Sequence, residues 1–298
     1  MNILDILNNQ NMANFVEYFK LRTDPFSLTP NFHFFYGSKK HLEVLKSIYT
    51  GILNNKGVFL LTGEVGTGKT ITSRVLMEKL SPYYNIAYIV NPFLSKEGIV
   101  KQIAEEFNLD ILHKKYDVLI TEIHMFLIEQ LKKGIGALVF IDEAQHLPDE
   151  TLEMVRMLSN LETRQRKLLQ FILIGQKELL KKLSKKSLRQ IAQRVALKCE
   201  LTPLNHIETH NYIIHRLKIA GGLGKIEFSK LAIFQIYKLT KGYPRTLNIL
   251  MYHIMTKLAE KEKHTVDVNI VKQAYKETLP FPVRYLPFML AKAIRGDI

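Results

Sequence analysis

The chain has 298 residues, of which 47% are hydrophobic. This content supports one large domain or two smaller ones with buried cores, and it excludes an intrinsically disordered chain. The 42 lysines and arginines outnumber 28 acidic residues and give a formal charge of +14, which favours a polyanionic partner such as nucleic acid or an acidic membrane surface.

That charge has an alternative explanation, because lysines that are only solvated would give the same excess. Cys199 is the only cysteine, so an intramolecular disulfide is excluded and a reducing compartment is expected. No apolar run is long enough to span a bilayer, and residues 1–10 lack the basic stretch that opens a secretory signal. We expect a cytoplasmic protein without a membrane span, at most peripheral to the inner membrane.

The first elements in chain order are an N-terminal segment and an alternating region. Residues 1–30 form the N-terminal segment, whose helical pattern through Phe15, Tyr18 and Phe19 should end at Asp24-Pro25. A helix at 38–53 precedes four apolar runs, which helical periodicity separates from one another, at 57–62, 86–90, 137–141 and 169–174. We therefore predict an α/β core over residues 31–204, with a mostly parallel sheet flanked by helices.

Beyond Pro203 the pattern changes to helices alone. Helical periodicity covers residues 207–220, 229–240, 244–260 and 267–277. We expect a small all-helical lid over residues 205–280, followed by a C-terminal tail, 281–298. The tail mixes aromatic and basic residues, so it either meets a partner or membrane surface or packs back on the lid.

A phosphate loop is the strongest motif in the sequence. Gly63-Glu64-Val65-Gly66-Thr67-Gly68-Lys69-Thr70 has the Walker A spacing, after an apolar run and before a helix. Its glycines allow a tight turn whose N–H groups converge on phosphate oxygens at a helix N-terminus. We expect Lys69 to reach the β- and γ-phosphates of ATP and Thr70 to coordinate Mg²⁺. The predicted nucleotide contacts are Gly63, Glu64, Val65, Gly66, Thr67, Gly68, Lys69, Thr70 and Ile71.

Two carboxylates follow the third apolar run. Asp142 and Glu143 come directly after Ala137–Ile141, at the carboxyl end of a strand, where open α/β sheets bind ligands. This is the Walker B arrangement. We expect Asp142 to hold the Mg²⁺ shell and Glu143 to orient or deprotonate the attacking water. The alternative, an acidic helix cap, suits Asp149 better.

Further candidates follow the remaining strands. Gln176 ends the fourth apolar run, where an amide can sense the γ-phosphate; an ordinary polar strand end is the alternative. Arg189 and Arg194 flank a short helical stretch before a strand at 195–201, and an arginine there can enter a neighbouring subunit's site. Arg245 opens a lid helix, and by its position alone it indicates only a surface residue.

These residues resemble the ExeA-type AAA+ ATPases of secretion and pilus biogenesis, a family that includes general secretion pathway protein A and is related to transposition ATPases such as TnsC. The matching blocks run through most of the chain. They are Asp24-Pro25-Phe26 with Pro30 and Phe35-Tyr36, Leu61 to Thr70, residues 141–145, 158–163, 174–176 and 188–194, and Gly242-Tyr243-Pro244-Arg245. The Leu-Ser-Asn-Leu-Glu-Thr block at 158–163 is distinctive.

The resemblance implies a P-loop AAA+ core with a lid, and ATP-dependent self-association into a ring or filament with hydrolysis between subunits. It also implies that Phe26 and Tyr36 lie near adenine, and it gives Gln176 the role of sensor 1 and Arg245 that of sensor 2. Full-length secretion members continue into a membrane span and a peptidoglycan-binding region. Neither is found up to Ile298, so we expect no cell-wall binding in cis.

Two functions remain open. The first is an assembly ATPase that serves a secretion or type IV pilus system through protein partners. The second is a TnsC-like transposition ATPase on double-stranded DNA, for which Lys181, Lys182, Lys185, Lys186 and Arg189 would track the phosphate backbone. A solvated helix face would explain these lysines equally well. A nucleotide switch without turnover is disfavoured because Glu143 is present.

Overall fold

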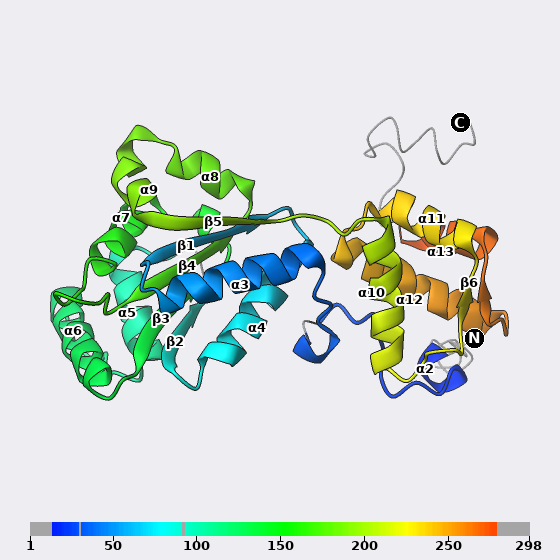
Figure 1. Cartoon of the computed structure of the whole chain (residues 1–298), viewed down its shortest axis with the longest axis horizontal. Helices are drawn as coiled ribbons and strands as arrows, with labels where there is room; N and C mark the ends of the chain where they lie inside the picture. Colours follow the sequence, from blue (N-terminus) through cyan, green and yellow to red (C-terminus); the bar gives the residue numbers. More distant parts are fainter. Residues whose placement is uncertain (1–13, 30, 91–92, 279–298) are drawn as a thin grey trace, which may run out of the picture. The chain divides into compact units, whose positions relative to one another are not determined.

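The structure is a computed structural model that describes residues 14–29, 31–90 and 93–278. It divides into two compact units. Residues 30–203 form one, here called the core unit, and residues 1–29 with 204–298 form the other, here called the helical unit (Figure 1). Residues 1–10, Pro30 and the tail 281–298, on which some sequence predictions rest, lie wholly outside the described residues.

The core unit is built on a parallel sheet, as the alternating pattern predicts. Its five strands have the order β2-β3-β4-β1-β5. Their bounds are β1 Val58–Gly63, β2 Tyr84–Ile89, β3 Gly136–Ile141, β4 Gln170–Gly175 and β5 Val195–Leu201. Every residue of β1 and β4 is buried, as expected of central parallel strands that are covered on both faces.

Helices cover both faces of this sheet (Figure 1). Their bounds are α3 Lys39–Leu53, α4 Lys69–Leu80, α5 Lys96–Glu106, α6 Tyr116–Lys132, α7 Asp149–Leu158, α8 Lys177–Leu183 and α9 Arg189–Arg194, with short 3₁₀ turns η1 Phe32–Phe34, η2 Ala144–His146 and η3 Lys186–Leu188. Successive strand residues point to opposite faces. Accordingly, Leu60 packs in the cluster of α5, α6 and α7, whereas Phe59 and Leu61 pack in the cluster of α3 and α4.

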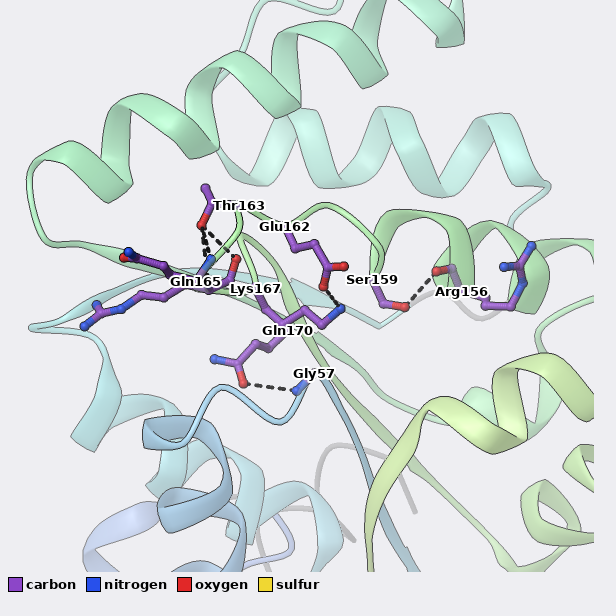
Figure 2. A network of polar contacts seen from close by, with 9 residues as sticks. Gly57, Arg156, Ser159, Glu162, Thr163, Gln165, Lys167 and Gln170 are labelled. Carbon is purple, nitrogen blue, oxygen red and sulfur yellow. Dashed lines mark hydrogen bonds and ion pairs between the residues drawn. The ribbon is translucent and has the colours of Figure 1, made fainter.

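A short turn carries the chain from α7 into β4 (Figure 2). Glu162 and Lys167 face each other across an antiparallel bridge and form an ion pair. Between them, the Thr163 hydroxyl oxygen accepts hydrogen bonds from the backbone N–H groups of Gln165 at 3.3 Å and Arg166 at 3.1 Å. The distinctive block at 158–163 therefore forms the entrance to this turn.

The helical unit contains α10 His206–Ile219, α11 Lys230–Thr240, α12 Pro244–Glu260 and α13 Val268–Glu277. It adds a pair that the prediction of an all-helical lid omits, the parallel strands β6 Glu227–Phe228 and β7 Thr265–Val266. Two-residue strands carry no periodic signal. Within the described residues, no helix is both long and apolar enough to cross a bilayer.

The N-terminal segment packs within the helical unit. Its short helix α2, Phe15–Tyr18, sets the Phe15 ring edge-on to Tyr252 with centroids 5.4 Å apart. The N–H of Arg22 donates to the Ala220 carbonyl at 2.8 Å. The buried Arg216 side chain donates to the Pro25 carbonyl. Residues 14–29 thus share their contacts with the helices that follow residue 204.

Candidate nucleotide-binding site

Glycines shape the loop that joins β1 to α4. Gly66 and Gly68 have φ of 80° and 95°, backbone conformations that glycine adopts at little cost. Gly68 is the N-cap of α4. A Cβ on Gly63 would lie 2.8 Å from the Leu201 carbonyl oxygen and 2.8 Å from Thr67 Oγ1. The loop backbone therefore requires glycine at these three positions.

Side chains of the loop stabilise this turn from inside. Thr67 is fully buried, and its hydroxyl donates to the Glu64 carbonyl at 2.8 Å. Lys69 is 6% exposed, and its amine donates to the carbonyls of Gly63 at 2.9 Å and Glu64 at 3.1 Å. Burial lowers the pKa of Lys69, while the negative charges of Glu143 and Asp142 oppose that shift. Val65, by contrast, is 55% exposed at the tip of the loop.

Thr70 and Asp142 meet at the carboxyl end of the sheet. The Thr70 hydroxyl donates to Asp142 Oδ2 at 2.9 Å, and Asp142 Oδ1 accepts from the Glu143 N–H at 2.9 Å. Asp142 is 5% exposed. Hydroxyl and carboxylate oxygens are ligands that Mg²⁺ prefers, and Mg²⁺ commonly takes only one or two protein ligands beside phosphate and water. The pair fits Mg²⁺ in that role, and the described residues contain no group of three or more His, Cys, Asp or Glu side chains that could hold a metal.

Tyr88 belongs to this site, although the sequence analysis missed it. Its hydroxyl donates to Asp142 Oδ2 at 3.0 Å. Burial, reinforced by the Asp142 charge, raises the pKa of Tyr88 to about 12, so the phenol keeps its proton at neutral pH. Tyr88 on β2 pairs with Phe140 on β3. That register brings it beside Asp142, and the register of two strands that are separated by helices α5 and α6 is not visible in the sequence.

Glu143 is held by two amide side chains. Gln145 Nε2 donates to Glu143 Oε2 at 2.6 Å, and Gln176 Nε2 donates to the same oxygen at 3.5 Å. Gln145 Oε1 also accepts from the Gln176 N–H at 3.1 Å. Glu143 has φ of 51°, and the turn η2 that follows returns Gln145 toward the end of β4. The structure thus brings together Glu143 and Gln176, two of the predicted site residues, and adds Gln145.

Comparison with known proteins assigns the family. A family model described as an AAA domain matches residues 52–183, which include Gly63–Thr70, Asp142 and Glu143. General secretion pathway protein A of Aeromonas hydrophila is 40% identical over an alignment of 242 residues that covers 79% of this chain. The chain carries an AAA domain of the ExeA type. The resemblance read from the sequence is confirmed, and this chain spans 43% of that relative's length.

Solved structures at low identity share the fold of this AAA protein. The Aeropyrum pernix ORC2 protein in its ADPNP-ADP complexes has a TM-score of 0.66 at 15% identity, over 88% of this chain and 74% of that chain. The Thermotoga maritima RuvB Holliday junction branch migration motor has a TM-score of 0.54 at 20% identity, over 87% and 75%. Drosophila ORC bound to DNA has a TM-score of 0.63 at 16% identity, over 98% and 75%. These likenesses confirm the predicted fold class, and an AAA domain is a nucleotide-binding domain.

The two candidate arginine fingers stand at the two ends of α9, the helix that leads into β5. Arg189 begins α9 and Arg194 ends it, and both are exposed. Val195 follows at once and pairs with Val58 at the start of β1. Gly63 ends that strand five residues later, roughly 16 Å away at about 3.3 Å per residue. Arg194 therefore lies near the amino-terminal end of β1, whereas its own phosphate loop follows the carboxyl end of that strand.

The remaining predicted residues of the AAA protein are placed as follows. Ile71 lies in the first turn of α4, and Arg245 is exposed in the first turn of α12 in the helical unit. The sensor role of Arg245 stays a prediction. Of the two aromatic residues implied near adenine, Phe26 is 1% exposed and Tyr36 is half-buried.

The lysines proposed to follow a DNA backbone are partly neutralised within the core unit. Asp149 forms ion pairs with Lys182 at 3.6 Å and with Lys185 at 3.1 Å. The Lys182 amine also donates to the Leu147 carbonyl. Lys181 and Lys186 are exposed. Because Asp149 pairs with Lys182 and Lys185, the cluster offers less positive charge to a DNA backbone than the number of its lysines implies.

Proposed function

We propose that this chain binds ATP with Mg²⁺ and hydrolyses it to ADP and phosphate, and that it self-associates and drives assembly or remodelling in a secretion or type IV pilus system. The observation that carries the hydrolytic part is the convergence of Thr70, Asp142 and Glu143 at one edge of the sheet. The Thr70 hydroxyl donates to Asp142 Oδ2 at 2.9 Å. Glu143 is the next residue, and its Oε2 accepts a hydrogen bond from the Gln176 side-chain amide at 3.5 Å.

Each side chain has a distinct part in the proposed reaction. Lys69 exchanges the carbonyls of Gly63 and Glu64 for oxygens of the β- and γ-phosphates, where its charge stabilises the transferring phosphoryl group. Thr70 and Asp142 hold Mg²⁺, which neutralises negative charge on the phosphates. Glu143 orients the attacking water and accepts its proton, and Gln176 senses the γ-phosphate beside it.

We also propose that one arginine of α9 completes the site of a neighbouring subunit. Support comes from the place of Arg194, beside Val58 at the far end of β1 from Gly63. Because this guanidinium is far from the phosphate loop of its own chain, we place it in the site of a second copy. There it forms paired hydrogen bonds to phosphate oxygens. Arg189, at the other end of the same helix, is the second candidate.

Mixing variants tests this trans arrangement. Arg194→Ala and Glu143→Gln subunits should each be inactive alone, and their mixture should recover part of the ATPase rate because some interfaces combine an intact Arg194 with an intact Glu143. A matched control mixes the Arg194→Ala/Glu143→Gln double variant with Glu143→Gln, which should recover nothing. Repeating the series with Arg189→Ala identifies the finger. Full turnover by a strictly monomeric protein would remove the proposal.

The alternative is a DNA-dependent role like that of the transposition ATPases. It is favoured by the formal charge of +14 and by the exposed Lys181 and Lys186. The ATPase rate and sedimentation should be measured with and without double-stranded DNA at low and moderate salt. Stimulation and co-sedimentation that fall as salt rises would favour the DNA role, because counterion release makes such binding steeply salt-dependent. Indifference to DNA would leave the secretion or pilus role, with protein partners at the cytoplasmic side of the membrane.

A further inference from the structure

A buried histidine touches the phosphate loop. His41 lies in the first turn of α3 and is 3% exposed. Its Nε2 is 3.1 Å from the Thr67 carbonyl oxygen, and its Nδ1 is 2.7 Å from Ser38 Oγ. A carbonyl oxygen only accepts hydrogen bonds, so Nε2 carries the proton and donates to it. In the neutral ring, Nδ1 then accepts from the Ser38 hydroxyl.

The bond to Thr67 controls the direction of the next amide. The carbonyl of Thr67 and the N–H of Gly68 belong to one planar trans peptide, so they point in opposite directions. A donor that holds the carbonyl on the α3 side therefore turns the Gly68 N–H to the other side, into the concavity where backbone amides of a phosphate loop converge on phosphate. Gly68, with φ of 95°, has no side chain to fix that peptide by itself.

The imidazole is also packed closely against the loop. A Cβ on Gly68 would lie 3.1 Å from His41 Nε2, so the ring lies against the backbone that it orients. The ring also meets Phe35 edge-on, with centroids 5.9 Å apart. Ser38, 2% exposed, caps α3 by accepting from the His41 N–H at 3.4 Å. Thr67, Ser38 and Phe35 thereby hold the histidine in place.

We infer that His41 is a positioning residue of the phosphate loop, which presents the Gly68 amide to the phosphates of the nucleotide through its hydrogen bond to Thr67. This inference rests on the proposed nucleotide binding at residues 63–70. A histidine that only fills space in the core would pack in the same way, but nucleotide binding would not depend on its Nε2 donor. The donor is therefore what the experiment must remove and restore.

The test compares two substitutions that differ in that donor. His41→Leu keeps bulk and removes the N–H, and it should weaken ATP and ADP binding about tenfold, the loss expected of one buried hydrogen bond. His41→Gln places an amide N–H at a similar distance along the side chain, and its affinity should stay within about threefold of the parent. Affinities are measured by calorimetric titration, with urea unfolding of each variant without nucleotide to report stability.

Ser38→Ala is the matched control, because it removes the partner of Nδ1 and leaves the Nε2 donor, so most affinity should remain. Wild-type affinity in His41→Leu, or equal losses in His41→Leu and His41→Gln, would overturn the inference. If the parent protein binds ATP in a manner that depends on Lys69 while His41→Leu has no effect, only the role of His41 fails. If the parent binds no ATP, the proposed function itself fails.

Discussion

The Tyr88 hydroxyl donates to Asp142 Oδ2 at 3.0 Å, the same oxygen that accepts from the Thr70 hydroxyl at 2.9 Å. Two strands and the phosphate-loop helix thus converge on one carboxylate oxygen. The pKa of Tyr88, raised to about 12 chiefly by burial, keeps this donor protonated across the physiological range. Tyr88 therefore orients the carboxylate that we propose holds Mg²⁺.

Tyr88→Phe should raise the Mg²⁺ concentration needed for half-maximal ATPase activity by about tenfold, because partners that orient a ligating carboxylate commonly contribute 10- to 100-fold to metal affinity. The measurement is a Mg²⁺ titration of the ATPase rate. Tyr84→Phe is the control, since Tyr84 lies at the other end of β2 and should leave the titration unchanged. An unaltered Mg²⁺ requirement in Tyr88→Phe would separate Tyr88 from the metal site.

Gln145 and Gln176 should act on turnover as one unit. Both donate to Glu143 Oε2, at 2.6 Å and 3.5 Å, and each single alanine substitution should lower kcat by misplacing that carboxylate. Because the two amides share one acceptor, the double variant should lose less than the product of the two single losses. Steady-state kinetics of the four proteins check this. Multiplicative losses would mean that the two glutamines act independently.

Gln170 should contribute to stability rather than to chemistry (Figure 2). It is 2% exposed, its Nε2 donates to the Ile52 carbonyl at 3.2 Å and its Oε1 accepts from the Gly57 N–H at 3.4 Å. Gln170→Leu removes the acceptor of the buried Gly57 N–H, while the Ile52 carbonyl keeps its bond from the Asn55 N–H at 2.9 Å. The substitution should lower the free energy of unfolding by about 1–3 kcal/mol, the cost of one unsatisfied buried group. Gln165 is exposed in the turn between α7 and β4. Gln165→Leu should therefore change the free energy of unfolding by no more than about 0.5 kcal/mol. Equal effects in urea denaturation would contradict this role.

Gly242 should tolerate no side chain. Its φ is +72°, and a Cβ there would lie 1.8 Å from the Leu204 carbonyl oxygen. Gly224 has φ of +77° with nothing within 4 Å of its Cβ position. Gly224→Ala should therefore cost only backbone strain, about 1 kcal/mol, whereas Gly242→Ala should cost about 2 kcal/mol more because the backbone must shift. Urea unfolding of both variants gives the comparison, and similar losses would show that the close approach to Leu204 relaxes freely.

Much of this fold follows from patterns along the chain. Apolar runs such as 57–62 and 137–141 mark central strands, because a strand covered on both faces is continuously hydrophobic. The phosphate loop is visible because its glycines and Lys69 must stand at fixed spacing. The boundary signal near residue 204 comes from the loss of such runs.

The parts that the sequence did not predict depend on spatial relationships. Tyr88 reaches Asp142 through the register of two strands, and Gln145 returns to Gln176 through a turn that begins at a residue with positive φ. His41 meets Thr67 from a helix that precedes the loop by a full strand. None of these pairs has a characteristic sequence spacing. The association of residues 14–29 with the helical unit is likewise long-range.

The central claim is that residues 63–70 with Asp142 and Glu143 form a site that hydrolyses ATP. The most direct measurement pairs ATP binding with single-turnover hydrolysis for the parent protein, Lys69→Ala and Glu143→Gln. The account predicts that the parent binds and hydrolyses ATP, that Lys69→Ala loses binding, and that Glu143→Gln retains bound ATP but does not cleave it. ATP affinity unchanged by Lys69→Ala, or cleavage at the parent rate by Glu143→Gln, would contradict it.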